Sequence, residues 1–183
     1  MAVLPLKVVP DPVLRQKAKR VKVIDASIRR LAEDMVDTMR HHQGAGLAAN
    51  QVGVLKRVIT IEVPEEPLRV LINPEIIKRE GERELEEGCL SIPDYRGLVT
   101  RAIWVRAKAL ELGGTEVRIR AEGILAQALE HEIDHLNGIL YIDHLKRHED
   151  LWKLESEEAS EEEEAPGSEE AVEAPQPEAA ATR

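Results

Sequence analysis

The chain has 183 residues, with 25 Lys and Arg against 35 Asp and Glu and a formal net charge of -10. From Leu151 to the last residue there are 11 Glu, no Asp and only Lys153 and Arg183 as cations, so this segment carries -9 and the preceding 150 residues carry -1. A folded part so close to neutral excludes a nucleic-acid-binding domain, or a binder of anionic membranes, that relies on net positive charge.

The charge distribution predicts two parts. Residues 1–150 have the size of one ordinary domain, and a hydrophobic content of 43% is compatible with a buried core. Residues 151–183 are expected to be an acidic, mostly disordered tail. The single cysteine, Cys89, excludes an intramolecular disulfide, and there is neither a recognisable signal sequence nor an apolar run long enough to span a bilayer. We therefore expect a soluble, cytoplasmic protein.

The first half of the chain predicts one main helix followed by strands. Prolines among basic residues up to Arg20 indicate a loop with a short helix. Asp25 is the expected N-cap of a helix ending near Gln43, because apolar residues recur after it at steps of three and four: Ile28, Leu31, Met35 and Met39. The β-type runs 58–63 and 70–72 then predict two strands.

The second half predicts a hairpin and a second helix. Runs 103–112 and 116–120 are separated by Gly113 and Gly114, which favour a tight turn. From about 122 to 137 the apolar residues follow a helical period, and Gly138 is the expected stop. Without a regular βαβ alternation, the pattern predicts an α+β fold, with short antiparallel strands packed around this central helix and an N-terminal helix beside them.

The central helix carries the strongest chemical signal, the HExxH pattern of residues 131–135. His131 and His135 are four residues apart and share a helix face, so both imidazoles can bind one metal ion, while Glu132 can move protons beside it. The same residues also fit an amphipathic helix with two surface histidines. A three-histidine zinc protease would need a third histidine at position 141, which is Tyr141.

A metal site with two histidines needs a third protein ligand and an open position. Cys89 is the natural candidate, although a lone cysteine is more often an inert buried residue. Spacing alone does not favour Cys89 over acidic and histidine side chains beyond the helix stop: Asp143, His144, His148 and Glu149.

A glycine-containing segment, 44–51, precedes the strands. Taken alone it predicts a helix C-cap and a tight turn, and it is not a phosphate-binding loop because no Gly-Lys-Ser/Thr follows.

The segments 44–51 (GAGLAANQ), 87–91 (EGCLS) and 131–135 (HEIDH) stand in the order and approximate spacing of the peptide deformylases. The resemblance covers about the first 145 residues. It differs at Glu130, where the family commonly has Gln before the first histidine, and the acidic tail has no family motif.

The resemblance implies an enzyme that removes the formyl group from the N-terminal formyl-methionine of newly synthesised proteins and releases formate. It implies that residues 1–150 are the catalytic domain and that Cys89, His131 and His135 bind one divalent metal ion. Fe2+ is the expected ion, with Zn2+ or Ni2+ able to substitute.

The resemblance also assigns roles around the metal. It implies that Glu132 is the general base and then the general acid, and that the Gln51 side-chain amide and the Leu90 backbone N–H stabilise the oxyanion. Substrate contacts fall to three further residues: Gly46 to the substrate backbone, Ala45 to the methionine pocket, and Arg96 close to the substrate. An ordinary surface arginine fits position 96 equally well.

Three alternatives remain open from the residues: a metallopeptidase or a general metallo-amidase using the same HExxH helix, and a catalytically silent, ribosome-associated metal protein. The expected partners are nascent formyl-methionyl polypeptides and, transiently, the ribosome; neither direct DNA binding nor a membrane is expected.

Overall fold

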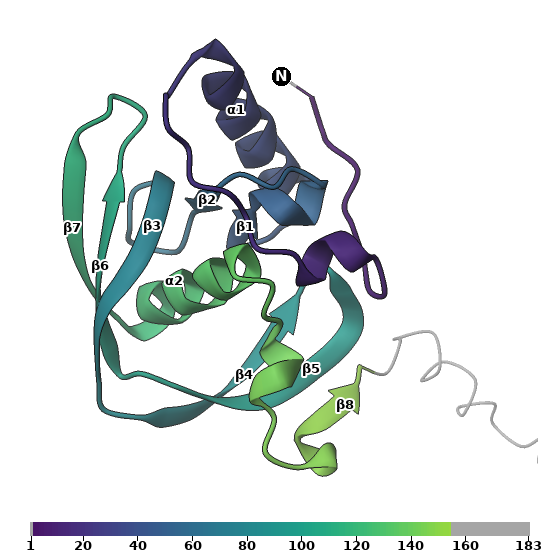
Figure 1. The fold of residues 1–183 in the computed structure, drawn as a ribbon. Coiled ribbons are helices and arrows are strands. Elements are labelled where there is room, and N and C mark those ends of the chain that lie inside the picture. Colours follow the sequence, from purple (N-terminus) through teal and green to yellow (C-terminus); the bar gives the residue numbers. More distant parts are fainter. Residues whose placement is uncertain (1, 155–183) are drawn as a thin grey trace, which may run out of the picture.

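The computed structural model describes residues 2–154, which form an α+β fold, as expected (Figure 1). The longer elements of this part of the chain are α1 (Ala26–His41), β1 (Gly46–Ala48), β2 (Val58–Ile61), β3 (Arg69–Glu80), β4 (Arg83–Cys89), β5 (Ile92–Arg101), β6 (Trp104–Leu110), β7 (Glu116–Glu122), α2 (Gly123–Leu136) and β8 (Leu151–Lys153). Short 3-10 helices lie at Pro12–Arg15, Ala49–Val52, Tyr141–His144 and His148–Asp150. Among the described residues, no helix is long and apolar enough to cross a membrane.

The larger sheet has five antiparallel strands in the order β1-β2-β3-β6-β7. β6 and β7 form the expected hairpin, and Gly114 in its turn has φ +86, a conformation that glycine adopts at little cost. β3 is much longer than the run 70–72 predicts. Its register shifts between Ile72 and Glu75, and this irregularity lets the strand continue past Pro74, which has no N–H to donate.

The smaller sheet has three antiparallel strands in the order β4-β5-β8. Sequence patterns do not predict β4 and β5, because β4 is rich in charged residues that have low strand propensity. β8 pairs with β5 through Tyr95 and Lys153, so the folded part continues through residue 153, three residues beyond the expected boundary at 150. The acidic tail expected beyond this point lies outside the described residues from position 155 on.

α1 begins at the expected N-cap. The Asp25 carboxylate accepts hydrogen bonds from the backbone N–H groups of Ser27 (2.9 Å) and Ile28 (3.1 Å), two donors that have no partner inside the helix. Met35 and Met39 on the apolar face of α1 are fully buried and pack in a core cluster with residues of β1, β2 and β3. α1 thereby packs against β1, β2 and β3 of the larger sheet.

α2 lies between the larger sheet and the β4–β5 pair (Figure 1). Its apolar residues, among them Leu129 and Ile133, form the largest core cluster with side chains of β2, β3, β6 and β7. The helix stops where expected: Gly138 has φ +77, and a Cβ at this position would collide with the Arg15 backbone. Packing on one side leaves the opposite face of α2 turned toward β4.

Candidate metal centre and active site

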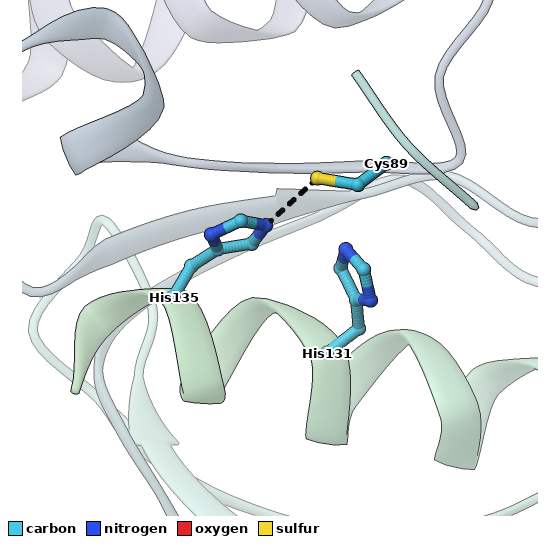
Figure 2. Close-up of side chains that lie close together, drawn as sticks. All are labelled: Cys89, His131 and His135. Carbon is cyan, nitrogen blue, oxygen red and sulfur yellow. Dashed lines mark hydrogen bonds between the residues drawn. The ribbon is translucent and has the colours of Figure 1, made fainter. Parts of the chain in front are cut away.

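His131 and His135 project from the same face of α2 toward Cys89, the last residue of β4 (Figure 2). The Cys89 Sγ lies 3.1 Å from the His135 Nε2, and one ligand atom from each of the three residues lies within 4.8 Å of the others. A thiolate and two imidazoles are a donor set that binds divalent transition metals, so the residues fit the metal centre expected from sequence.

Two features hold Cys89 and the helix in place. A two-residue turn at Leu90 and Ser91 joins β4 to β5, and the Ser91 backbone N–H donates to the Cys89 Sγ at 3.4 Å. The Asn50 side-chain amide donates to the His135 backbone carbonyl and so ties α2 to the 3-10 helix after β1. The ligands therefore come from two elements that are separately anchored.

The electrostatics of the site favour the thiolate form of Cys89. Burial disfavours the Cys89 thiolate, but the neighbouring imidazoles of His135 and His131 outweigh it and hold the pKa of Cys89 well below its ordinary value. Burial lowers the pKa of His131, but hydrogen bonds to Cys89 and Glu87 outweigh the effect of burial. The pKa of His131 therefore lies well above its ordinary value. The thiolate is the form of cysteine that binds metal, so the pocket supplies the competent ligand.

Glu87, a member of the 87–91 motif with no expected role, lies behind His131. Its carboxylate is 2.8 Å from the His131 Nδ1 and accepts two hydrogen bonds from Arg101, at 2.7 and 2.9 Å. Arg101 also donates to Asp134 on α2 at 2.6 Å, and Glu87 and Arg101 are almost completely buried. With Nδ1 engaged, His131 is oriented to present its Nε2 to a metal. The pair has no sequence pattern of its own, because Arg101 is 14 positions from Glu87 and lies on another strand.

Glu132 lines a cavity of about 460 Å³ together with Cys89 and His131. The side chain is buried, which raises the pKa of its carboxyl to about 7, and its Oε2 has no hydrogen-bond partner among the described residues. Gly46 packs directly against this carboxylate, and a Cβ at position 46 would collide with it. Glu132 therefore lies at the cavity wall with one buried carboxylate oxygen, Oε2, that no group of the described residues engages.

The Gln51 side-chain amide has a defined orientation. Its Oε1 accepts from the Ala48 backbone N–H at 2.8 Å, so its Nε2 points toward Ser91 Oγ (3.1 Å) and Cys89 Sγ (3.5 Å). An amide N–H donor is therefore held beside the metal ligands.

The remaining residues expected at the site also line this cavity. Leu90 lies in the β4–β5 turn, Ala45 precedes β1, and Arg96 stands opposite Gly88 in the β4–β5 ladder with its guanidinium against the Gly88 backbone. The structure brings together all nine side chains or backbone positions expected at the site: Ala45, Gly46, Gln51, Cys89, Leu90, Arg96, His131, Glu132 and His135.

The other residues considered as a third metal ligand do not lie with Cys89, His131 and His135. Within residues 2–154, the only His, Cys, Asp and Glu cluster that could share a metal ion is the one containing Cys89. His144 is engaged with Asp134 at 2.8 Å, and Asp143 forms an ion pair with Arg15. Tyr141 is buried, and its ring stacks with that of His131.

Glu130 is the position where this chain departs from the family pattern. Its side chain is buried, but both carboxylate oxygens accept hydrogen bonds. One carboxylate oxygen accepts from the Arg79 guanidinium at 2.7 Å and the other from the Ala102 backbone N–H at 3.0 Å. The substitution therefore adds an ion pair between the buried Glu130 of α2 and the half-exposed Arg79 of β3, and it leaves the ligands in place.

The comparisons with known proteins agree with this geometry. A sequence model described as polypeptide deformylase matches residues 3–150. A peptide deformylase of Dehalococcoides mccartyi is 53% identical over 155 residues, covering 84% of this chain and 93% of that protein, and one of Halothermothrix orenii is 55% identical over 148 residues, covering 80% and 96%.

Solved structures show the same likeness. A peptide deformylase from Legionella pneumophila has a TM-score of 0.77 and 44% identity and covers 79% of this chain and 87% of that one. A peptide deformylase from Ehrlichia chaffeensis in complex with actinonin has a TM-score of 0.79 and 40% identity, covering 82% and 92%. The match over most of the folded part, at this identity, shows that the chain belongs to the polypeptide deformylase family.

Proposed function

We propose that the protein is a metal-dependent peptide deformylase that removes the formyl group from the N-terminal formyl-methionine of nascent chains and releases formate. The observation that carries the proposal is the convergence of Cys89, His131 and His135 beside the unengaged carboxylate of Glu132, in a cavity of a chain from this family.

Cys89, His131 and His135 would hold the metal, and Fe2+ is the ion that we propose, with Zn2+ or Ni2+ as substitutes. A divalent ion bound there supplies Lewis acidity and makes water a stronger acid. The protein contributes the orientation of the ligands: Glu87 and Arg101 fix the His131 ring, and Asn50 fixes the end of α2.

Glu132 moves the protons of the reaction. Its free Oε2 accepts a proton from the attacking water, and the same carboxyl then delivers a proton to the nitrogen of the departing amine. Burial supports this cycle, because a carboxyl with a pKa of about 7 can both gain and lose a proton near neutral pH.

Gln51 and Leu90 stabilise the charge that develops on the formyl oxygen. The Gln51 Nε2 already points into the site because its Oε1 is engaged by Ala48, so little reorganisation is needed as the charge forms. The Leu90 backbone N–H is the second proposed donor, in the turn directly after Cys89.

Gly46, Ala45 and Arg96 bind the substrate at the cavity wall. Gly46 approaches the substrate backbone closely because it carries no side chain, Ala45 lines the methionine pocket, and Arg96 contacts the chain beyond it. The catalytic domain in this proposal comprises residues 1–150 together with β8, which pairs with β5. Nascent chains reach it during transient association with the ribosome in the cytoplasm, and neither DNA nor a membrane takes part.

The decisive experiment compares acyl groups. A formyl carbon carries only hydrogen beside its carbonyl, whereas an acetyl methyl would crowd the packed space between Gln51, Leu90 and Glu132, and acetyl is also less electrophilic. The metal-loaded enzyme should process formyl-Met-Ala with a kcat/KM at least about a hundredfold above that for acetyl-Met-Ala. Comparable rates would indicate a general metallo-amidase, and internal cleavage of an unblocked peptide would indicate a metallopeptidase.

A further inference from the structure

The last described residue lies at the active-site cavity. β8 runs antiparallel to β5, with Lys153 opposite Tyr95 (Figure 1). One residue further on, the Leu154 backbone N–H donates to the Asp94 carbonyl at 2.7 Å, and Leu154, Asp94 and Tyr95 all line the cavity that contains Cys89 and Glu132. Leu154, which directly follows β8, is therefore part of the wall of the proposed substrate site.

Two large apolar side chains are exposed at this wall. Leu154 is 46% exposed and Tyr95 is 39% exposed, and within the described residues neither belongs to a core cluster. An isolated exposed apolar side chain needs no explanation on a convex surface. Leu154 follows β8 and Tyr95 lies on β5, and both line the same cavity; two exposed apolar side chains that line one concave, partly polar site are typical of ligand contacts.

The size of the cavity leaves room for more than the reacting group. Formyl and methionine are held where the metal ligands, Glu132 and Gln51 converge, and a cavity of about 460 Å³ exceeds what these two groups fill. The rest of a nascent chain must leave through the open side. An extended chain advances about 3.3–3.6 Å per residue, so the residues after methionine pass along the wall within a few positions.

We propose that Leu154 and Tyr95 contact the substrate side chains that follow methionine, so that the C-terminal strand makes the enzyme favour an apolar residue at one of these positions. The inference rests on the proposed deformylase function. The β5–β8 pairing and the backbone hydrogen bond to Asp94 fix the position of Leu154. Substrate binding therefore loses little conformational entropy at this residue.

Negative charge offers a competing basis for selection. Glu86 and Asp94 line the cavity, and seven of the ten residues from 155 to 164 are Glu. Selection by these charges would favour cationic substrates and would fall with salt, whereas selection by an apolar contact would not. A chain ending after Leu154 keeps the proposed contact and removes the acidic segment.

The test uses the metal-loaded enzyme and formyl-Met peptides in which the second, third or fourth residue is Leu or Ser. The preference is the Leu-over-Ser ratio of kcat/KM at the position where it is largest. Leu154→Ala should lower this ratio about fivefold, mainly through KM, because the lost contact binds substrate and transition state alike. Leu154→Met should retain the ratio.

Ile103→Ala is the matched control, because Ile103 is also 46% exposed but does not line the cavity, and it should leave the ratio unchanged. If Leu154→Ala fails to keep the metal content and melting temperature of the parent, Tyr95→Ser tests the same contact from β5, with the same expected fall.

The outcomes separate the two proposals. If formyl-Met-Ala-Ser is deformylated but the parent enzyme shows no Leu preference, or the preference survives both Leu154→Ala and Tyr95→Ser, the apolar contact is refuted while the proposed function stands. A Leu preference that survives both substitutions but disappears on truncation after Leu154 likewise refutes the apolar contact and assigns the preference to residues beyond 154. If no formyl peptide is processed, the proposed function itself fails.

Discussion

At the scale of single residues, Cys89 is the ligand whose replacement is most informative. Cys89→Ser puts a neutral hydroxyl where the site holds a thiolate, and a hydroxyl binds divalent transition metals far more weakly. The variant should lose most of its metal, measured by elemental analysis after anaerobic purification. Stoichiometric metal with near-normal formate release would show that Cys89 is not the third ligand.

Glu132 tests the separation of proton transfer from metal binding. Glu132→Gln keeps the shape of the side chain but cannot cycle a proton, so formate release should fall by about 10²–10⁴-fold. Metal content should stay stoichiometric, because Glu132 lies outside the cluster of Cys89, His131 and His135. Loss of the metal in this variant would give Glu132 a structural role instead.

At the scale of elements, the Glu87–Arg101 pair joins β4 to β5, and Arg101 also binds Asp134 on α2. Arg101→Met should lower the free energy of unfolding by about 3–5 kcal/mol, because it leaves two buried carboxylates without their cation. Denaturant unfolding measures the loss. The exposed pair of Lys146 and Glu84 provides the control, since Lys146→Met should change stability by less than about 1 kcal/mol.

The cap of α1 gives stability a defined pH dependence. Hydrogen bonds from Ser27 and Ile28 lower the pKa of Asp25 in the folded state. A lowered folded-state pKa means that the stabilising contribution is complete above the unfolded pKa, about 3.9, and is lost as the pH falls through the folded value.

Asp25→Ala should therefore lower the melting temperature at neutral pH and have a smaller effect at about pH 3 and below. Asp25→Asn is the matched control, because asparagine caps a helix about as well but carries no charge. Its melting temperature, relative to the parent, should improve as the pH falls. An Asp25→Ala effect that does not change with pH would show that the ionised carboxylate is not the stabilising form.

At the scale of the whole molecule, two truncations distinguish the folded part from the acidic segment. A chain ending after Leu154 should keep the parent melting temperature and its rate on uncharged formyl-Met peptides, because the removed residues are Glu-rich without apolar periodicity. A chain ending after Asp150 also loses β8 and its pairing with β5, so it should melt at a lower temperature. Equal melting temperatures for the two chains would mean that β8 adds nothing to the fold.

Features that depend on neighbouring residues could be predicted from the amino-acid sequence. The apolar periods and caps located α1 and α2, Gly113 and Gly114 located the β6–β7 hairpin, and the four-residue spacing of His131 and His135 placed both on one helix face. These features are local because helical and hairpin geometry relates residues only a few positions apart. The family resemblance, too, depends on short motifs in order along the chain.

Contacts between residues far apart in the sequence could be found only in the folded structure. It brought Cys89 to His135 over 46 positions, paired Glu87 with Arg101 and placed Leu154 at the cavity. The charged segment β4 forms a strand because β5 supplies its hydrogen-bond partners. The low strand propensity of the residues in β4 does not predict this pairing. The physical reason is the same in each case: long-range pairing and burial are properties of the packed chain, and a local pattern does not record which distant partner satisfies them.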